Sequence, residues 1–122
     1  MGRTEVNATI IGPHAEREFT FLVDTGAVFV GLPAEEIENL GLIPIPNGRR
    51  QFVTANGVVE RDSYGAYGRL EDQGFLATVM VAPIPLIGYE LLENMRFRVN
   101  PVTQSLERVG DEEMGPPYML KT

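Results

Sequence analysis

The chain of 122 residues contains no cysteine and only one histidine, His14. The absence of cysteine excludes a disulfide framework, thiol catalysis and a cysteine-based zinc site. With a single imidazole, neither Ser63 nor Ser105 has a credible His–Asp partner, which argues against a serine hydrolase. His14 follows the Gly12-Pro13 turn signal and is expected on the surface. We therefore expect no metal and no other cofactor.

Long apolar runs and clustered positive charges are also missing. No stretch approaches the length needed to cross a bilayer, and residues 1–5 lack the apolar core of a signal peptide. The net charge is -7, and Arg49-Arg50 is the only adjacent basic pair. Because phosphate binding needs clustered cations, nucleic acid is disfavoured as a partner. The sequence thus predicts a cytoplasmic protein that binds neither nucleic acid nor membrane.

The residues that are present suit one globular domain. Hydrophobic residues make up 43% of a chain whose length allows a single core but not two. We expect this domain to span residues 1–110. The acidic and then proline-containing tail, residues 111–122, is expected to be mobile or to take part in a subunit contact.

Apolar and polar residues alternate along much of the chain, which predicts a mainly β fold. The strongest hairpin signal is Asn56-Gly57, flanked by strand-like residues on both sides. Two short helices are predicted at residues 33–41, with Ala34, Ile37 and Leu40 buried, and at residues 89–95. The expected strand pairs are residues 6–10 with 19–23, 51–55 with 58–61, 64–70 with 75–81 around a turn at 71–74, and 97–99 with 106–109.

One of these strands, residues 19–23, runs directly into Asp24-Thr25-Gly26. A carboxylate at the inner end of a strand is costly unless it is neutralised, hydrogen-bonded or used. Gly26 lets another backbone or a ligand approach closely, and period two places Leu22 on the same face as Asp24. The pattern favours a catalytic carboxylate. The alternative is a simple type I turn, because Asp and Gly are common turn residues.

The order of these features resembles that of the retropepsin-like aspartic proteases, the single-domain family that includes the retroviral enzymes, and especially their small prokaryotic relatives. The resemblance covers roughly residues 4–108 and is carried by Asp24-Thr25-Gly26-Ala27, the Asn56-Gly57 hairpin and Leu86-Ile87-Gly88. It implies an all-β closed barrel with one or two short helices and one half-site per chain. Activity would then require a symmetric homodimer.

The resemblance also implies a role for each matching residue. Asp24 matches the catalytic aspartate, and Thr25 matches the residue whose hydroxyl bonds the partner subunit's loop, while Gly26 and Ala27 complete the active-site loop. The flap corresponds to Thr54, Ala55, Asn56, Gly57, Val58 and Val59. The substrate-pocket residues correspond to Leu22, Ile84 and Leu86, and Ile87 and Gly88 match the segment packed beneath the active-site loop.

Two Asp24 carboxylates held close together cannot both ionise cheaply, so they would share one proton. The ionised member would activate water and the protonated member would polarise the scissile carbonyl, without a metal. The expected substrate is an extended peptide bound under the flaps as an added strand. Because the expected pocket residues are apolar, hydrophobic residues are expected beside the cleaved bond.

The chain departs from the retroviral pattern at Val28, Phe29 and Tyr89, where those enzymes carry acidic residues and an arginine. A packing contact is expected to replace the lost ion pair. Two other functions remain open. One is a dimeric peptide-binding module with weak or no catalysis. The other is a scaffold domain, which gives no reason to place a carboxylate in a subunit interface.

Overall fold

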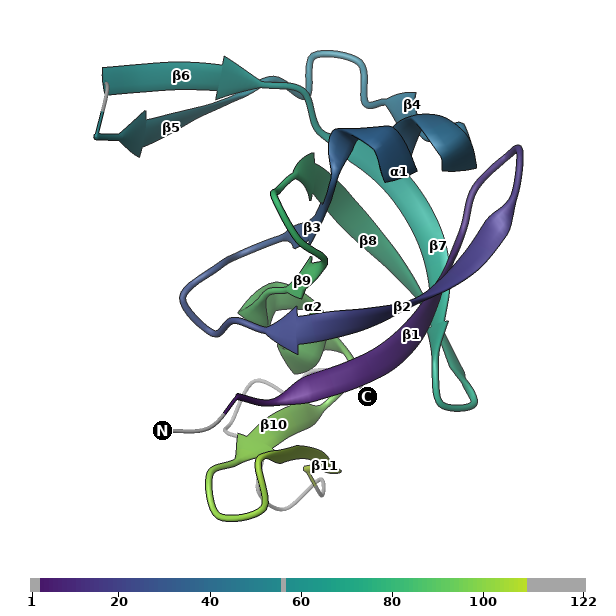
Figure 1. Cartoon of the computed structure of the whole chain (residues 1–122), viewed down its shortest axis with the longest axis vertical. Helices are drawn as coiled ribbons and strands as arrows, with labels where there is room; N and C mark the ends of the chain where they lie inside the picture. The colour runs from purple at the N-terminus through teal and green to yellow at the C-terminus, as the bar shows by residue number, and fades with distance from the viewer. Residues whose placement is uncertain (1–2, 56, 110–122) are drawn as a thin grey trace, which may run out of the picture.

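The computed structural model describes residues 3–55 and 57–109, and these form strands and two short helices (Figure 1). The helices are α1 (Ala34–Leu40) and α2 (Tyr89–Asn94). The strands are β1 (Glu5–Ile11), β2 (Glu16–Val23), β3 (Val30–Leu32), β4 (Ile43–Pro44), β5 (Arg50–Thr54), β6 (Gly57–Arg61), β7 (Tyr64–Leu70), β8 (Gln73–Val81), β9 (Leu86–Ile87), β10 (Phe97–Asn100) and β11 (Ser105–Arg108). The predicted strand pairs are confirmed.

Six strands close into a barrel in the order β1-β2-β9-β3-β8-β7, because β7 also pairs with β1 through Ile10 and Gly68. β4 is added outside this ring, along β7. The pairs β2–β9 and β3–β8 are parallel, and the other pairs in the ring are antiparallel. Closure removes the exposed edges that an open sheet would present. The expected all-β closed barrel is confirmed.

The barrel interior is filled by the inward residues of these alternating strands. Ile10, Phe21, Leu32, Leu70 and Val79 have no more than traces of exposed surface. Burying each such side chain stabilises the fold by about 1.5–3 kcal/mol. In β2 the rings of Phe19 and Phe21 also meet edge to face, with centroids 5.7 Å apart.

The two helices each pack buried residues into the hydrophobic core. α1 ends at Gly41, whose φ of +72° suits glycine, and it buries Ile37 and Leu40. The prediction that Ala34 is buried is wrong, because this first helical residue is exposed and the buried stripe is one turn long. α2 buries Leu91 and Leu92.

Three short strands and one turn differ from the sequence prediction. β3, β4 and β9 were not predicted, because strands of two or three residues are too short to show a period of two. The turn between β7 and β8 contains only Glu71 and Asp72, since Leu70 already pairs with Gln73. Glu71 accommodates this tight turn with a φ of +57°.

Two hairpins stand outside the barrel. β5 and β6 form one two-stranded sheet, and β10 and β11 form another. Within the second, Arg98 Nε donates to Glu107 Oε1 at 2.7 Å, and this contact, helped by the amide of Asn100, lowers the pKa of the Glu107 carboxyl. Arg108 stacks over the Phe97 ring within the hairpin, and it joins the hairpin to the barrel by donating to Gln73 Oε1 of β8 at 2.7 Å.

Candidate active site

Asp24 is the first residue after β2, where the chain turns out of the barrel. Its backbone N–H donates to the carbonyl of Ile87 at 2.9 Å, which continues the parallel pairing of β2 with β9. Its side-chain Oδ1 accepts the N–H of Gly26 at 3.0 Å, and its carbonyl accepts the N–H of Ala27 at 3.0 Å. The segment is therefore a turn in which the Gly26 amide orients the Asp24 carboxylate. The turn and the catalytic carboxylate are not exclusive, because the same backbone conformation suits both.

The start of α2 supports this turn. The N–H of Tyr89 donates to the carbonyl of Ala27 at 2.9 Å, and the N–H of Glu90 donates to the carbonyl of Val28 at 3.3 Å. Gly88 leaves no room for a side chain, because a Cβ there would lie 2.6 Å from the Val28 carbonyl. Ile87 is fully buried next to it. The segment that contains Ile87 and Gly88 thus packs directly against the loop that carries Asp24.

The loop presents its polar groups to solvent in the single chain. Asp24 is half-buried, Thr25 and Gly26 are exposed, and Ala27 is half-buried. Gly26 is crowded from within, since a Cβ there would lie 3.3 Å from Asp24 Oδ1. The hydroxyl of Thr25 and the carboxylate of Asp24 are accordingly available to groups outside this chain.

Apolar side chains on the neighbouring segments are also exposed. Val28 is 37% exposed, Ile84 is 42% exposed and Tyr89 is 42% exposed. Ile84 precedes Pro85, whose carbonyl accepts the N–H of Leu22 at 3.0 Å, so it is tied to the end of β2. Exposed apolar groups gathered around a polar turn are typical of a surface that binds a partner.

A hollow of about 350 Å³ lies beside the loop. It is lined by residues 26–31, residues 80–82 and Leu86, and none of these described residues is charged. Leu86 was predicted as a pocket residue, whereas Leu22 and Ile84 are not among the described residues that line this hollow. The contribution of residues 80–82 was missed, because it depends on the parallel pairing of Gly31 with Met80. The only signal in the sequence was the apolar run that ends β8.

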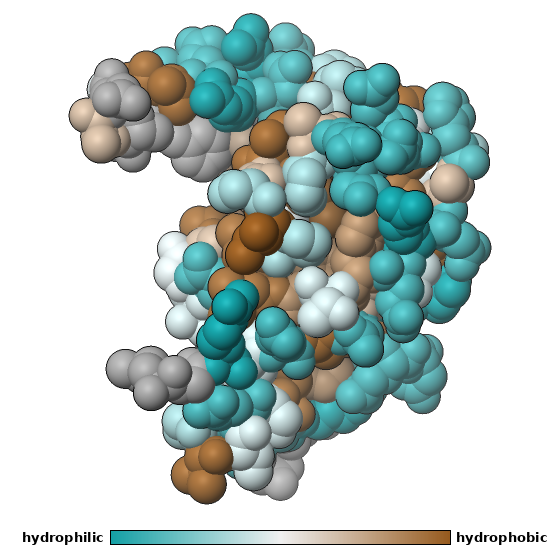
Figure 2. Space-filling model, viewed as in Figure 1, coloured by the Kyte–Doolittle hydropathy of each residue, from teal (hydrophilic) through white to brown (hydrophobic). Residues whose placement is uncertain are grey.

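The predicted flap is the β5–β6 hairpin, which projects from the same side of the view as the loop after β2 (Figure 1). In the space-filling view the molecule is hollowed between these two projections (Figure 2). Thr54 pairs with Gly57 at the end of the hairpin, and Asn56 lies outside the described residues. Ala55 is exposed, Val58 is 64% exposed and Val59 is half-buried. The hairpin therefore carries an exposed apolar side chain near its tip.

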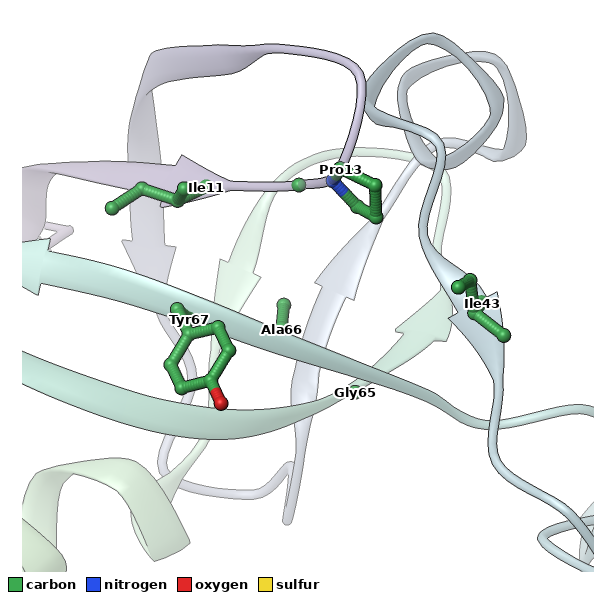
Figure 3. Close-up of a pocket in the computed structure, with 7 residues that line it drawn as sticks. Ile11, Pro13, Ile43, Gly65, Ala66 and Tyr67 are labelled. Atoms are coloured by element: carbon green, nitrogen blue, oxygen red, sulfur yellow. The ribbon is translucent and has the colours of Figure 1, made fainter.

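A second hollow, of about 270 Å³, lies between the end of β1, β4 and β7 (Figure 3). Its side chains include Ile11, Ile43 and Tyr67, and the Tyr67 hydroxyl is the polar side-chain group drawn there. No acid or base that could act in hydrolysis is found among the described residues that line it. This hollow therefore carries no catalytic assignment.

Among residues 3–55 and 57–109, no three histidine, aspartate or glutamate side chains are grouped so that they could hold a metal ion. Neither described helix is long and apolar enough to span a membrane.

Comparison with known proteins shows the family of this chain and relatives that share its fold. A family described as "Aspartyl protease" matches residues 6–84, more than half of the chain. The crystal structure of a retropepsin-like aspartic protease from Rickettsia conorii is similar, with a TM-score of 0.61 and 26% identity over 81% of this chain and 77% of that chain. The solution structure of Simian Foamy Virus (mac) protease shares the fold, with a TM-score of 0.57 and 20% identity over 74% and 92% of the two chains. Comparison with curated proteins gave no match. The chain therefore belongs to the aspartyl protease family and has the retropepsin-like fold.

Proposed function

We propose that this chain is one subunit of a homodimeric aspartic endopeptidase. The observation that supports this most directly is the Asp24 carboxylate, half-buried and oriented by the Gly26 amide in a chain of the aspartyl protease family. The mechanism needs one ionised and one protonated carboxyl group, and each chain supplies one Asp24. A symmetric pair of chains completes the site, with each Thr25 hydroxyl bonded to the loop of its partner.

The paired carboxyl groups carry out hydrolysis by general acid–base catalysis. The ionised Asp24 accepts a proton from water as the water oxygen attacks the scissile carbonyl carbon. The protonated Asp24 donates to the carbonyl oxygen, which gives a tetrahedral gem-diol. The roles then reverse: one carboxyl protonates the amide nitrogen, the C–N bond breaks, and the other accepts the proton of a gem-diol hydroxyl. Protons balance over the cycle, and no cofactor takes part.

The substrate of this proposal is an extended peptide that lies between the Asp24 loop and the β5–β6 hairpin, with side chains alternating into pockets. The hollow beside the loop takes an apolar side chain, because its described lining carries no charge. Leu22 and Ile84 contribute to adjoining pockets in the dimer. Val28 and Tyr89 replace charge with apolar contact area at the same end of the site.

The test is cleavage of a peptide library by the wild-type protein and by Asp24→Asn. The amide is nearly isosteric, so the variant should fold and dimerise normally while hydrolysis falls roughly a thousandfold or more. Asp72→Asn is the matched control, because Asp72 is a highly exposed residue in the turn after β7. Turnover by purified Asp24→Asn at the wild-type rate would refute the proposal.

The same geometry also supports a second candidate, a dimeric peptide-binding module. The observation that favours it is the uncharged hollow, which can hold a side chain whether or not the peptide is cut. The two candidates can be distinguished with a peptide in which a statine-type, hydroxyl-bearing unit replaces the scissile amide. An enzyme should bind this mimic of the tetrahedral intermediate at least a hundredfold more tightly than a plain peptide of the same length. A binding module should not discriminate between them.

A further inference from the structure

The orientation of the β5–β6 hairpin relative to the barrel depends on the segments at the base of the hairpin. Within the described residues, β5 and β6 pair with each other and with no strand of the barrel. The hairpin extends away from the body as a projecting arm (Figure 1). Because strand pairing to the barrel does not hold it, the angle of the hairpin depends on the two segments at its base, residues 45–49 and 62–63.

Ser63 joins these two segments by hydrogen bonds that run in opposite directions. Its hydroxyl donates to the carbonyl of Gly48 at 2.6 Å, and its own carbonyl accepts the N–H of Ile45 at 2.8 Å. Gly48 in turn donates its N–H to the carbonyl of Ile45 at 2.9 Å. Ser63 has no exposed surface, and its hydroxyl bond to Gly48 is part-buried. The buried hydroxyl is thus committed to a structural contact and is not a nucleophile.

The shape of this contact depends on Gly48. A Cβ at Gly48 would lie 2.5 Å from Ser63 Oγ and 2.8 Å from both the Cβ and the carbonyl oxygen of Ile45. A side chain at this position would therefore displace the hydroxyl or the backbone of the neighbouring turn. The segment before β5 and the segment before β7 fit together only because one of them has no side chain.

The contact also lies between two strand ladders. The β4–β7 ladder ends with Pro44 opposite Tyr64, and the β5–β6 ladder begins with Arg50 opposite Arg61. On the outside, Arg49 approaches Glu60 and Asp62 at 3.6 Å, but these exposed pairs are screened by solvent and contribute little. Removing the buried Ser63 hydroxyl takes this part-buried hydrogen bond from the Gly48 carbonyl, and this loss has the larger effect.

We propose that Ser63 is a positioning residue that sets the angle of the β5–β6 hairpin over the Asp24 loop. The inference rests on the proposed function in one respect, that the hairpin covers the bound peptide. With the hydroxyl present, the hairpin is held near one orientation, and less conformational entropy is lost when it closes on a peptide. Without it, the hairpin samples more orientations and peptide binding weakens. The chemical step is spared, because the Asp24 turn is held by β9 and α2.

The experiment compares Ser63→Ala with Ser105→Ala, because Ser105 is an exposed residue of β11 whose hydroxyl forms a 2.7 Å hydrogen bond with the hydroxyl of Thr103. Segment-resolved amide hydrogen exchange and peptide hydrolysis are measured on the same samples. In Ser63→Ala, exchange in β5 and β6 should rise about tenfold while exchange in β1 and β2 stays unchanged. KM should rise about tenfold and kcat should change by less than about twofold. Ser105→Ala should match the wild type in every measurement.

Gly48→Ala provides a second route to the same contact from the opposite side. Its Cβ should displace the Ser63 hydroxyl and reproduce the faster exchange of the hairpin. In the Ser63→Ala background, Gly48→Ala should raise the exchange rate of the hairpin by a smaller factor than it does in the wild-type protein. The reason is that the oxygen that it would displace is already absent. Full additivity of the two effects would overturn the proposed contact.

Three other outcomes would overturn the proposal. The first is unchanged exchange in β5 and β6 of Ser63→Ala. The second is an equal rise throughout the barrel, which would make Ser63 an ordinary core residue. The third is faster exchange of the hairpin with unchanged KM, which would mean that the orientation of the hairpin does not affect substrate binding. Because hydrogen exchange needs no turnover, it decides the role of Ser63 even if Asp24→Asn shows that the protein is not a peptidase.

Discussion

The Asp24 loop and the β5–β6 hairpin are held by opposite means. The loop receives backbone hydrogen bonds from α2 and donates one to β9, and Gly88 packs against it without space for one carbon atom. The hairpin pairs with itself, and the two segments at its base are joined to each other by Ser63 and Gly48. Gly57 in the hairpin has nothing within 4 Å of where a Cβ would lie.

This difference matches what each region would have to do in a peptidase. Paired carboxyl groups must be held to within about half an ångström, which requires rigid support. A cover must open to admit a peptide, and regions with few buried contacts open most readily. Gly88→Ala and Gly57→Ala test whether the loop is rigid and the hairpin movable, and Thr25→Val and Ala27→Ser test what the loop itself does.

Gly88→Ala should produce the largest effect. Its Cβ would overlap the Val28 carbonyl, so the start of α2 and the Asp24 loop must move apart. We expect the free energy of unfolding to fall by about 3 kcal/mol, measured by urea denaturation. Gly65→Ala is the matched control, because Gly65 has open space at the Cβ position. Equal stability of the two variants would contradict the tight packing of the loop.

Thr25→Val tests whether the loop also bonds to a second chain. Valine keeps the shape of threonine but removes the exposed hydroxyl, and in the proposed symmetric dimer it removes one hydroxyl from each chain. The dimer dissociation constant should rise about tenfold or more, measured by sedimentation and by loss of activity on dilution. Thr20→Val is the control, since the Thr20 hydroxyl bonds Asn7 within the same chain. A variant that stays dimeric and active at the wild-type dilution limit would count against this contact.

Gly57→Ala examines the hairpin by the same glycine-to-alanine change. The backbone φ of +112° disfavours any other residue, so the turn should be destabilised by about 1 kcal/mol. Since the hairpin is not paired to the barrel, the melting temperature of the domain should hardly change, while amide exchange in β6 rises. A loss of global stability comparable to that of Gly88→Ala would mean that the hairpin belongs to the core.

Ala27→Ser should have the smallest effect and concerns acidity in the loop. In the proposed dimer, a serine hydroxyl next to the paired Asp24 groups can donate to the ionised form and so favours it. The profile of kcat/KM against pH should therefore move about half a unit toward acid, measured on one peptide for both proteins. With Ala27 in place, we expect activity that extends from mildly acidic toward neutral pH. A stationary profile, or one moved toward alkali, would show that no such hydrogen bond forms.

Much of the framework was predictable because it is local. The alternation that ends at Val23 places Asp24 at the end of a strand, and Asn56-Gly57 specifies a hairpin by its turn chemistry. Gly41 marks the end of α1 by its conformational freedom. The resemblance to the family could also be recognised from the sequence, because the motifs that carry it are short and contiguous. The match to an aspartyl protease family over residues 6–84 confirms the recognition.

The sequence by itself thus determined the mainly β character, the hairpins, the helices and the place of Asp24 at a strand end, since period and turn preference act between near neighbours. Only the tertiary structure decided that Leu22 pairs in parallel with Leu86, that Gly31 lies beside Met80, and that Ser63 joins Gly48. These contacts depend on how strands far apart in the chain are ordered around the barrel. A residue pattern of period two states which face a side chain occupies, but it does not state which strand will lie next to it.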